Sequence, residues 1–139
     1  MAEDWDKVLE LAKVLEDRAK SGYSDKVRDH GENPRNAGEM DEFDSFAIIT
    51  GPCGDTMAMW IKVENDIITG IGFTTDGCMT SLAAGSMTTE MAKGKSLAEA
   101  AKISQQDVLD ALEGLPEANE HCALLSTNTL KEAVKNYLE

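Results

Sequence analysis

Positive charge is scarce in this sequence, which carries 13 Lys and Arg against 26 Asp and Glu and has a formal net charge of −13. A protein that binds DNA or RNA through phosphates needs a basic surface, so the composition argues against a nucleic-acid partner. A basic protein is a better match, because opposite charges speed encounter. An acidic surface that merely keeps the protein in solution explains the composition equally well.

Long apolar runs are also missing, and no stretch approaches the roughly 20 apolar residues that span a membrane. Residues 1–5 lack the basic start and the apolar run of a secretory signal. We therefore expect a cytoplasmic protein that does not contact a membrane. The length of 139 residues suits one domain that buries its own hydrophobic core without disulfides.

Cysteine and histidine are rare, with 3 Cys and 2 His in the chain. The number of cysteines is odd and a reducing compartment keeps thiols free, so metal binding or reactivity explains them better than disulfides. All the cysteines lie beside turn-forming residues or at an expected helix start: Cys53 in Gly51-Pro52-Cys53-Gly54-Asp55, Cys78 in Asp76-Gly77-Cys78, and Cys122 directly after His121.

The first part of the chain carries helix and loop signals. Residues 4–20 place apolar side chains at helical spacing between charged ones, which predicts an amphipathic helix. A second helix is expected over 23–30, and the Pro, Asn and Gly of residues 33–38 predict a loop. The acidic residues of 39–44 are expected to continue this loop as a solvated connection.

Strand signals follow over residues 46–50, 56–63 and 67–75. In the second segment apolar residues alternate with others, which is typical of a strand with one face in a core. In the third, the residues expected to share one face are Ile67, Thr69, Ile71 and Phe73. Gly70 and Gly72 leave room for close packing on that strand. The short connections favour an antiparallel meander of three strands.

After Cys78 the spacing of apolar residues becomes helical. A helix is expected from Met79 to Lys93-Gly94, where a basic last turn precedes glycine. Ser96 and Ser104 predict the caps of two further short helices. The last helix is expected to carry an apolar stripe of Leu124, Leu125, Leu130, Val134 and Leu138. The predicted fold class is α+β, a three-stranded antiparallel sheet with helices packed on it and an extra N-terminal helix.

The cysteines, Asp55 and His121 form the candidate site. Cys78 and Cys122 stand at expected helix starts, where the positive end of the helix dipole favours anionic ligands. Three sulfurs with one nitrogen or oxygen suit tetrahedral zinc or an iron–sulfur cluster, with Cys53, Cys78 and Cys122 as ligands and Asp55 or His121 as the fourth. A carboxylate matches iron–sulfide chemistry less well than a fourth thiolate, which indicates a site that releases its cluster.

Each of these residues also has a purely structural interpretation. A single free cysteine is often just a small buried apolar residue, but three beside Pro, Gly, Asp and His favour a site. His30 lacks such neighbours and is interpreted as structural, and the methionines are interpreted mostly as core. A hydrolase with Cys122 as nucleophile is disfavoured, because a thiol and an imidazole adjacent in sequence rarely reach the required geometry.

Separated motifs follow one another from Tyr23 to the C-terminus: Tyr23-Ser24-Asp25-Lys26-Val27, Asp29-His30, Glu32-Asn33-Pro34-Arg35-Asn36, Gly51-Pro52-Cys53-Gly54-Asp55, Asp76-Gly77-Cys78, Lys93-Gly94-Lys95-Ser96-Leu97 and His121-Cys122. In this order they resemble the IscU/NifU-type iron–sulfur cluster assembly scaffolds. The resemblance implies a scaffold domain over residues 23–139, preceded by an N-terminal amphipathic helical extension over residues 1–22.

The resemblance implies a non-enzymatic scaffold that accepts sulfur from a cysteine desulfurase of the IscS/NifS type. Iron and an electron donor such as a ferredoxin complete a transient [2Fe-2S] cluster, which passes to apo iron–sulfur proteins. By position, Cys53, Cys78 and Cys122 match the cluster cysteines, and Cys122 the persulfide acceptor. Asp55 matches an aspartate that influences metal occupancy and cluster release, and His121 a histidine of the ligand pocket. Tyr23 matches a tyrosine implicated in scaffold pairing, which is compatible with a homodimer.

The segment before His121 departs from the family pattern. Members that work with a dedicated Hsp70 chaperone carry Leu-Pro-Pro-Val-Lys, whereas this chain has Leu115-Pro116-Glu117-Ala118-Asn119, which argues against chaperone-driven release. An alternative function is a zinc-bound sulfur acceptor of the SufU type that relays persulfide from a desulfurase, because zinc fills the same ligands. The interval between Cys78 and Cys122 lacks the long insertion of those relatives, which favours the scaffold. The helix over 4–20 lies outside the resemblance and is either a dimer or partner contact or an extra packed helix.

Overall fold

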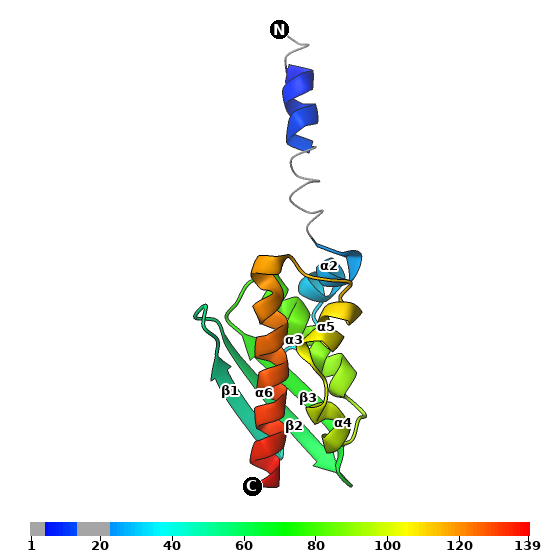
Figure 1. Cartoon of the computed structure of the whole chain (residues 1–139), viewed down its shortest axis with the longest axis vertical. Coiled ribbons are helices and arrows are strands. Elements are labelled where there is room, and N and C mark those ends of the chain that lie inside the picture. Colours follow the sequence, from blue (N-terminus) through cyan, green and yellow to red (C-terminus); the bar gives the residue numbers. More distant parts are fainter. Residues whose placement is uncertain (1–4, 14–22) are drawn as a thin grey trace.

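The structure, a computed structural model, describes residues 5–13 and 23–139 (Figure 1). Residues 5–13 form a helix. The elements that follow are α2 (Asp25–Glu32), β1 (Ser45–Thr50), β2 (Thr56–Glu64), β3 (Ile67–Thr75), α3 (Met79–Ala92), α4 (Leu97–Ala101), α5 (Gln105–Ala111), the 3-10 helix η1 (Glu117–Asn119) and α6 (Glu120–Leu138).

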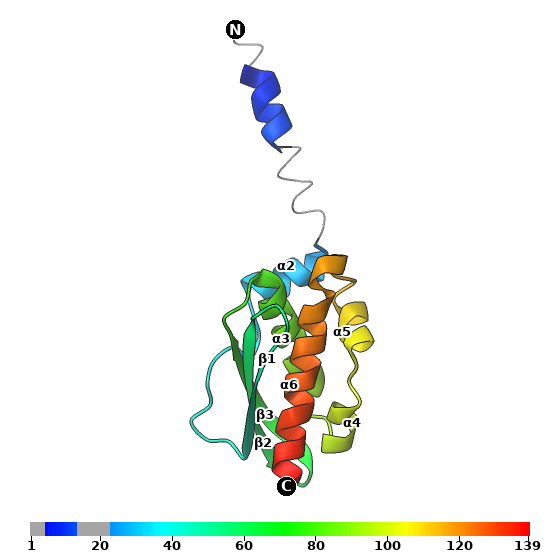
Figure 2. The ribbon, with the colours of Figure 1, turned by 60° about the vertical axis from the view of Figure 1, so that its left-hand side comes forward.

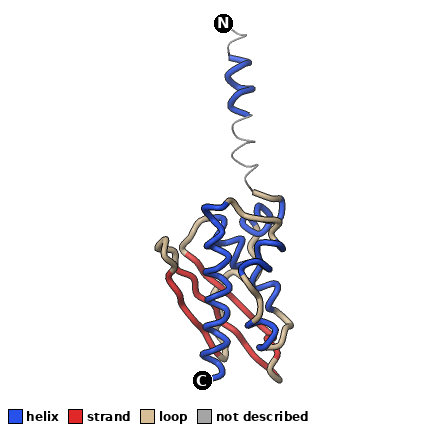
Figure 3. The backbone as a smooth tube through the Cα atoms, in the orientation of Figure 1, coloured by secondary structure: helices blue, strands red, loops and turns tan. Residues whose placement is uncertain are grey.

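The three strands form one antiparallel sheet in the order β1-β2-β3. The turn between β2 and β3 places Asn65 at φ 54° and Asp66 at φ 61°, the left-handed pair that a tight hairpin turn requires. Helix α6 packs on β1 and β2, and α3 packs on β3. Figures 2 and 3 show helices α3 to α6 gathered on one face of the sheet, as the predicted α+β class requires.

The core lies between this face and the helices. Met57, Met59 and Ile61 of β2 are fully buried, which confirms the predicted alternation in that strand. Met87 of α3 is buried as well, so these methionines are core residues, as expected. The predicted caps of α4 and α5 are confirmed, because Ser96 and Ser104 each form a capping box.

β3 differs from the prediction near its start. Its pairing with β2 shifts after Lys62, which marks a β-bulge. The extra residue at a bulge turns the neighbouring side chains to the opposite face. Ile68 is therefore fully buried, whereas Ile67 is half-buried and Thr69 is exposed. The expectation that Ile67 and Thr69 share the core face with Phe73 was wrong.

The predicted loop over residues 33–44 is confirmed, and its first part also pairs with the sheet. The N–H of Gly38 donates to the carbonyl of Phe73 at 2.7 Å, and the N–H of Phe73 donates to the carbonyl of Asn36 at 3.0 Å. This pairing covers the outer edge of β3. A Cβ on Gly72 would lie 2.7 Å from the carbonyl oxygen of Gly38, so the expected close packing on this strand is confirmed. Residues 41–44 are exposed, as expected.

The two long helices, α3 and α6, are buried to different extents. α3 is buried on several sides, hydroxyl residues included, because it lies between α2, β3 and α6. In α6 the middle of the predicted stripe is buried, but Leu124 is 43% exposed and Leu138 is 68% exposed, so the stripe was wrong at these two positions. His30 is buried with its Nδ1 atom 2.7 Å from the Oγ atom of Ser86, which confirms its structural role.

The N-terminal helix is seen over residues 5–13, and all of these residues are exposed. The remaining residues of the predicted helix, 4 and 14–20, lie outside the described part of the chain. The division at residue 22 and the role of this helix stay predictions. Among the described residues, no helix combines the length and the apolar character needed to cross a membrane.

Candidate metal centre

The loop between β1 and β2 presents the first two candidate ligands. The N–H of Gly51 donates to the carbonyl of Asp55 at 2.8 Å, and the N–H of Gly54 donates back to the carbonyl of Gly51 at 3.0 Å. Gly54 has φ +92°, a conformation that favours glycine. This closed turn leaves Cys53 exposed and Asp55 half-buried.

His121 faces this loop from the first turn of α6. One ligand atom from each of Cys53, Asp55 and His121 lies within 4.8 Å of the other two. Ligand atoms of one tetrahedral zinc ion lie about 2.0–2.3 Å from it and therefore about 3.3–3.8 Å from one another. The three ligand atoms lie close enough to form one metal site after they move together by about 1 Å, and a thiolate, a carboxylate and an imidazole are a chemically suitable set.

Cys78 is the N-cap residue of α3. Its Sγ atom lies 3.0 Å from the Oγ1 atom of Thr80, and this hydroxyl is the main reason that the pKa of the Cys78 thiol is lowered. The N–H groups of Thr80 and Ser81 at the start of the helix lower this pKa further, while burial and the charge of Asp55 oppose them. The thiol of Cys78 therefore loses its proton more readily than an ordinary cysteine, which suits a metal ligand.

Cys122 lies in the first turn of α6 but is only 1% exposed, in contrast to the exposed Cys53 and Cys78. Its Sγ atom is 3.4 Å from the Oγ atom of Ser81, 3.5 Å from the Oγ1 atom of Thr80 and 3.7 Å from the Nε2 atom of His121. Cys122 is the point at which α3 and α6 meet in the site.

The predicted site residues therefore form two groups that adjoin each other. Cys53, Asp55 and His121 form one group, and Cys78 and Cys122 form the other. Ser81 joins the groups, because its Oγ atom is also 3.2 Å from the Oδ2 atom of Asp55. Both candidates for the fourth ligand stand beside Cys53, so the geometry does not select between Asp55 and His121.

Thr80, Ser81 and Asn119 belong to this site although the sequence did not single them out. The side-chain amide of Asn119 donates to the Oγ1 atom of Thr80 at 3.3 Å. The only sequence feature that could have indicated Thr80 and Ser81 is their position two and three residues after Cys78, at a helix start. Hydroxyls are common at helix starts, so the burial of these two side chains against sulfur was not predictable from their positions in the sequence.

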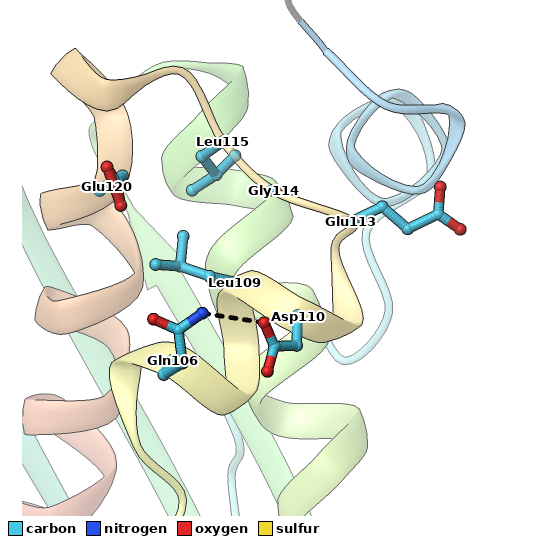
Figure 4. A pocket seen from close by; sticks show the side chains of 7 residues that line it. All are labelled: Gln106, Leu109, Asp110, Glu113, Gly114, Leu115 and Glu120. Atoms are coloured by element: carbon cyan, nitrogen blue, oxygen red, sulfur yellow. Dashed lines mark hydrogen bonds between the residues drawn. The ribbon is translucent and has the colours of Figure 1, made fainter.

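A separate hollow lies between α5 and α6 (Figure 4), and none of the sulfur ligands lines it. Carboxylates of Asp110, Glu113 and Glu120 border it, with the Nε2 atom of Gln106 donating to the Oδ1 atom of Asp110 at 2.8 Å. Figure 4 shows the side chain of Glu113 directed away from the other side chains of the hollow. The acidic groups do not converge there, so the cysteine-bearing end is the candidate site.

Comparisons with known proteins identify the family of this chain. The family model described as NifU-like N terminal domain matches residues 22–139. The iron-sulfur cluster assembly scaffold protein IscU 1 of Archaeoglobus fulgidus is 46% identical over 116 residues, which cover 83% of this chain and 76% of that protein. The scaffold protein IscU of Escherichia coli K12 is 42% identical over 120 residues, which cover 83% of this chain and 93% of that protein.

A solved structure shares the fold at low sequence identity. The NifU-like protein (N-terminal) from Brucella abortus superposes with a TM-score of 0.72 at 15% identity, covering 86% of this chain and 96% of that one. At this identity the likeness concerns the fold alone. The family model, by contrast, spans all of the elements from α2 to α6. The chain therefore belongs to the NifU-like N terminal domain family.

Proposed function

We propose that this protein is a scaffold for the assembly of iron–sulfur clusters. It accepts sulfur, combines it with iron, holds a [2Fe-2S] cluster for a short time and transfers it to apo-proteins. The observation that carries the proposal is the contact between the loop of Cys53 and Asp55, the start of α3 and the start of α6, which brings together every cysteine of the chain. The relatives named as IscU scaffolds support it.

Sulfur arrives at Cys122 in this proposal. The Cys122 thiolate attacks the terminal sulfur of a persulfide on the cysteine desulfurase, the sulfur–sulfur bond of the donor breaks, and the donor leaves as a thiolate. Because Cys122 is 1% exposed, this step requires the first turn of α6 to open or the donor cysteine to enter the site.

The assembled cluster is cargo, held by Cys53, Cys78 and Cys122 with Asp55 or His121 as the fourth ligand. Two of these cysteines are exposed, so the cargo lies at the surface, where an acceptor protein reaches it. A weakly matched oxygen ligand from Asp55 favours release of the cargo over permanent binding. The protein therefore performs no catalytic turnover of its own, and the cysteines act as temporary ligands.

The partners follow from the same chemistry. They are a cysteine desulfurase of the IscS/NifS type, an electron donor such as a ferredoxin, apo iron–sulfur proteins and, compatible with Tyr23, a second copy of the chain. A dedicated Hsp70 chaperone is not included, since Asn119 stands where the chaperone motif has lysine and its amide binds Thr80. The cytoplasm, a reducing compartment, keeps the cysteines free, as they are here.

Anaerobic reconstitution tests the proposal. Purified protein is incubated with a desulfurase, cysteine, a reductant and ferrous iron, and its iron, acid-labile sulfide and visible spectrum are measured. Comparable amounts of iron and sulfide with visible charge-transfer bands are expected. Absence of both from the wild-type protein would reject the scaffold function.

A Cys122→Ser variant tests the sulfur route. Without the thiolate of Cys122, the variant is expected to take up no persulfide from the desulfurase, as measured by mass spectrometry of each cysteine-containing peptide. A matched Cys53→Ser variant keeps Cys122 and is expected to take up persulfide there. An undiminished persulfide on another cysteine of the Cys122→Ser variant would move the acceptor role to that residue.

The second candidate is a zinc-bound sulfur acceptor that relays persulfide without building a cluster. The ligand atoms of Cys53, Asp55 and His121 favour it, since they lie within 4.8 Å of one another and offer a single metal ion a thiolate, a carboxylate and an imidazole. Zinc without sulfide after reconstitution, together with faster desulfurase turnover, would establish this function in place of the scaffold.

A further inference from the structure

Two hydroxyl groups at the start of α3 lie between the candidate ligands. We propose that Thr80 and Ser81 are positioning residues of the scaffold site, whose hydroxyls donate hydrogen bonds that hold Cys78, Cys122 and Asp55 ready for a metal ion or cluster. This inference rests on the proposed function, because it concerns the ligands of that site. Both residues are fully buried, so water does not replace their hydroxyls.

The hydroxyl of Thr80 has one proton and three neighbours. The amide N–H of Asn119 donates to its oxygen at 3.3 Å, so its own proton is left to point at a sulfur. The Sγ atoms of Cys78 and Cys122 lie 3.0 and 3.5 Å away, and the single proton serves one of them at a time. Asn119 thus fixes Thr80 as a donor to sulfur.

The hydroxyl of Ser81 has a similar choice. Its Oγ atom lies 3.2 Å from the Oδ2 atom of Asp55, to which it donates, and 3.4 Å from the Sγ atom of Cys122. Cys122 is the alternative acceptor for both hydroxyls. When Cys122 carries negative charge as a thiolate, both protons can turn towards it without any movement of the backbone.

The backbone beside this pair supports the assignment independently. A Cβ on Gly77 would lie 2.4 Å from the Oγ atom of Ser81 and 3.0 Å from the Oδ2 atom of Asp55. The chain therefore approaches Ser81 and Asp55 more closely than any other residue type allows at position 77. The Ser81 hydroxyl is confined between the backbone, a carboxylate and a sulfur.

Two consequences follow for a bound metal. Partners that orient metal ligands through hydrogen bonds are typically worth about 10–100-fold in metal affinity. Hydrogen bonds to sulfur also tune the reduction potential of a cluster, because a donor stabilises the more negative, reduced form. Loss of the Thr80 hydroxyl should therefore weaken metal binding and lower the reduction potential of a reconstituted cluster.

Zinc affinity of the reduced, metal-free protein provides the test. Zn²⁺ is titrated in competition with a chromophoric chelator for the wild type and for Thr80→Val, Thr80→Ser and Ser81→Ala. Thr80→Val and Ser81→Ala are expected to bind zinc about 10-fold more weakly or worse. Thr80→Ser retains the hydroxyl and is expected to bind as the wild type does.

The matched control is Thr88→Val on the same helix. Thr88 is also fully buried and its Oγ1 atom lies 2.7 Å from the Oγ atom of Ser126, away from the ligands. This variant loses a buried hydroxyl of the same kind and is expected to keep both its zinc affinity and its cluster reduction potential. Equal zinc losses in Thr88→Val and Thr80→Val would show a general effect of stability and overturn the proposal.

The outcomes separate this inference from the function on which it rests. If the wild type binds neither zinc nor a cluster, the scaffold function fails and the inference fails with it. If the wild type binds zinc and Thr80→Val binds it equally well with an unchanged reduction potential, only the inference fails. Weaker zinc binding and a lower potential in Thr80→Val, both restored in Thr80→Ser, support it.

Discussion

The interface between α3 and α6 contains two sets of buried hydroxyls that differ in how their protons are used. At Ser126, the hydroxyl donates to the carbonyl of Ala123 at 3.1 Å and lies 2.7 Å from the Oγ1 atom of Thr88, so each proton has one acceptor. At Thr80 and Ser81, each proton has two acceptors. Ser126 and Thr88 connect the two helices through hydroxyls that have one acceptor each, whereas Thr80 and Ser81 lie between alternative acceptors that are also the candidate metal ligands.

The largest effect on stability is expected from Gly85→Ala, in the part of α3 that faces the sheet. A Cβ there would lie 2.4 Å from the ring of Phe73, which is fully buried. Overpacking costs about 1–3 kcal/mol, and the better helix propensity of alanine returns at most about 1 kcal/mol. Urea unfolding should show a net loss of about 1–2 kcal/mol, with unchanged zinc affinity. Weaker zinc binding by the folded variant would contradict the expectation that packing around Gly85 does not affect the candidate metal site.

Gly77→Ala is the counterpart at the site. Its Cβ would displace the Ser81 hydroxyl and would also lie 2.6 Å from the Cβ of Ser81, which is fixed to the backbone of α3. Zinc affinity is expected to fall about 10-fold, with a loss of stability of about 1 kcal/mol from the added crowding. Chelator competition and urea unfolding measure the two quantities. An unchanged zinc affinity in this variant would contradict the expectation.

The features that could be predicted from the sequence are those in which apolar residues recur at a regular spacing. The alternation in β2 gave its core face, and the change of period after Cys78 gave the start of α3. The bulge that buries Ile68 was not predictable, because it depends on how two strands pair. Nor were Thr80 and Ser81, since a hydroxyl at a helix start looks the same in sequence whether it faces water or sulfur.

The five candidate ligands illustrate the same limit. Their residue types and neighbours indicated a site, and the fold brings them to one end of the molecule. The split into a group around Cys53 and a pair around Cys122 depends on the packing of α3 against α6, which no spacing encodes. The burial of Cys122 has the same origin.

Thr88→Val measures the contribution of a paired hydroxyl. Removing it leaves Ser126 with its bond to the carbonyl of Ala123, so no strongly unsatisfied group remains. A buried hydrogen bond of this kind contributes about 1 kcal/mol, and urea unfolding should show a loss of that size. A larger loss, above about 3 kcal/mol, would mean that the hydroxyl is part of a wider network than the structure shows.

The smallest effect concerns the pH dependence at His30, which binds Ser86 of α3 away from the cysteines. Burial, followed by the positive charge of Arg35, lowers the pKa of His30 below its ordinary value of 6.5, although Asp29 and Glu90 oppose this shift. The unfolded chain therefore takes up this proton more readily than the folded protein. The stability that neutral His30 contributes is fully present above pH 6.5 and is lost as the pH falls through the folded-state pKa.

A comparison with His30→Asn isolates this contribution, because an asparagine amide can take the place of Nδ1 beside Ser86. Urea unfolding between about pH 7 and pH 5, with a chelator present, should show that the wild type loses more stability on acidification than the variant. His121 is present in both proteins and cancels in the difference. The lowered pKa values of Asp29 and Glu99 act at lower pH, and only that of Asp29 depends in part on the charge of His30. Equal pH slopes for the two proteins would show that folding does not change the pKa of His30. The contribution of His30 to stability would then come from its hydrogen bond to Ser86 alone.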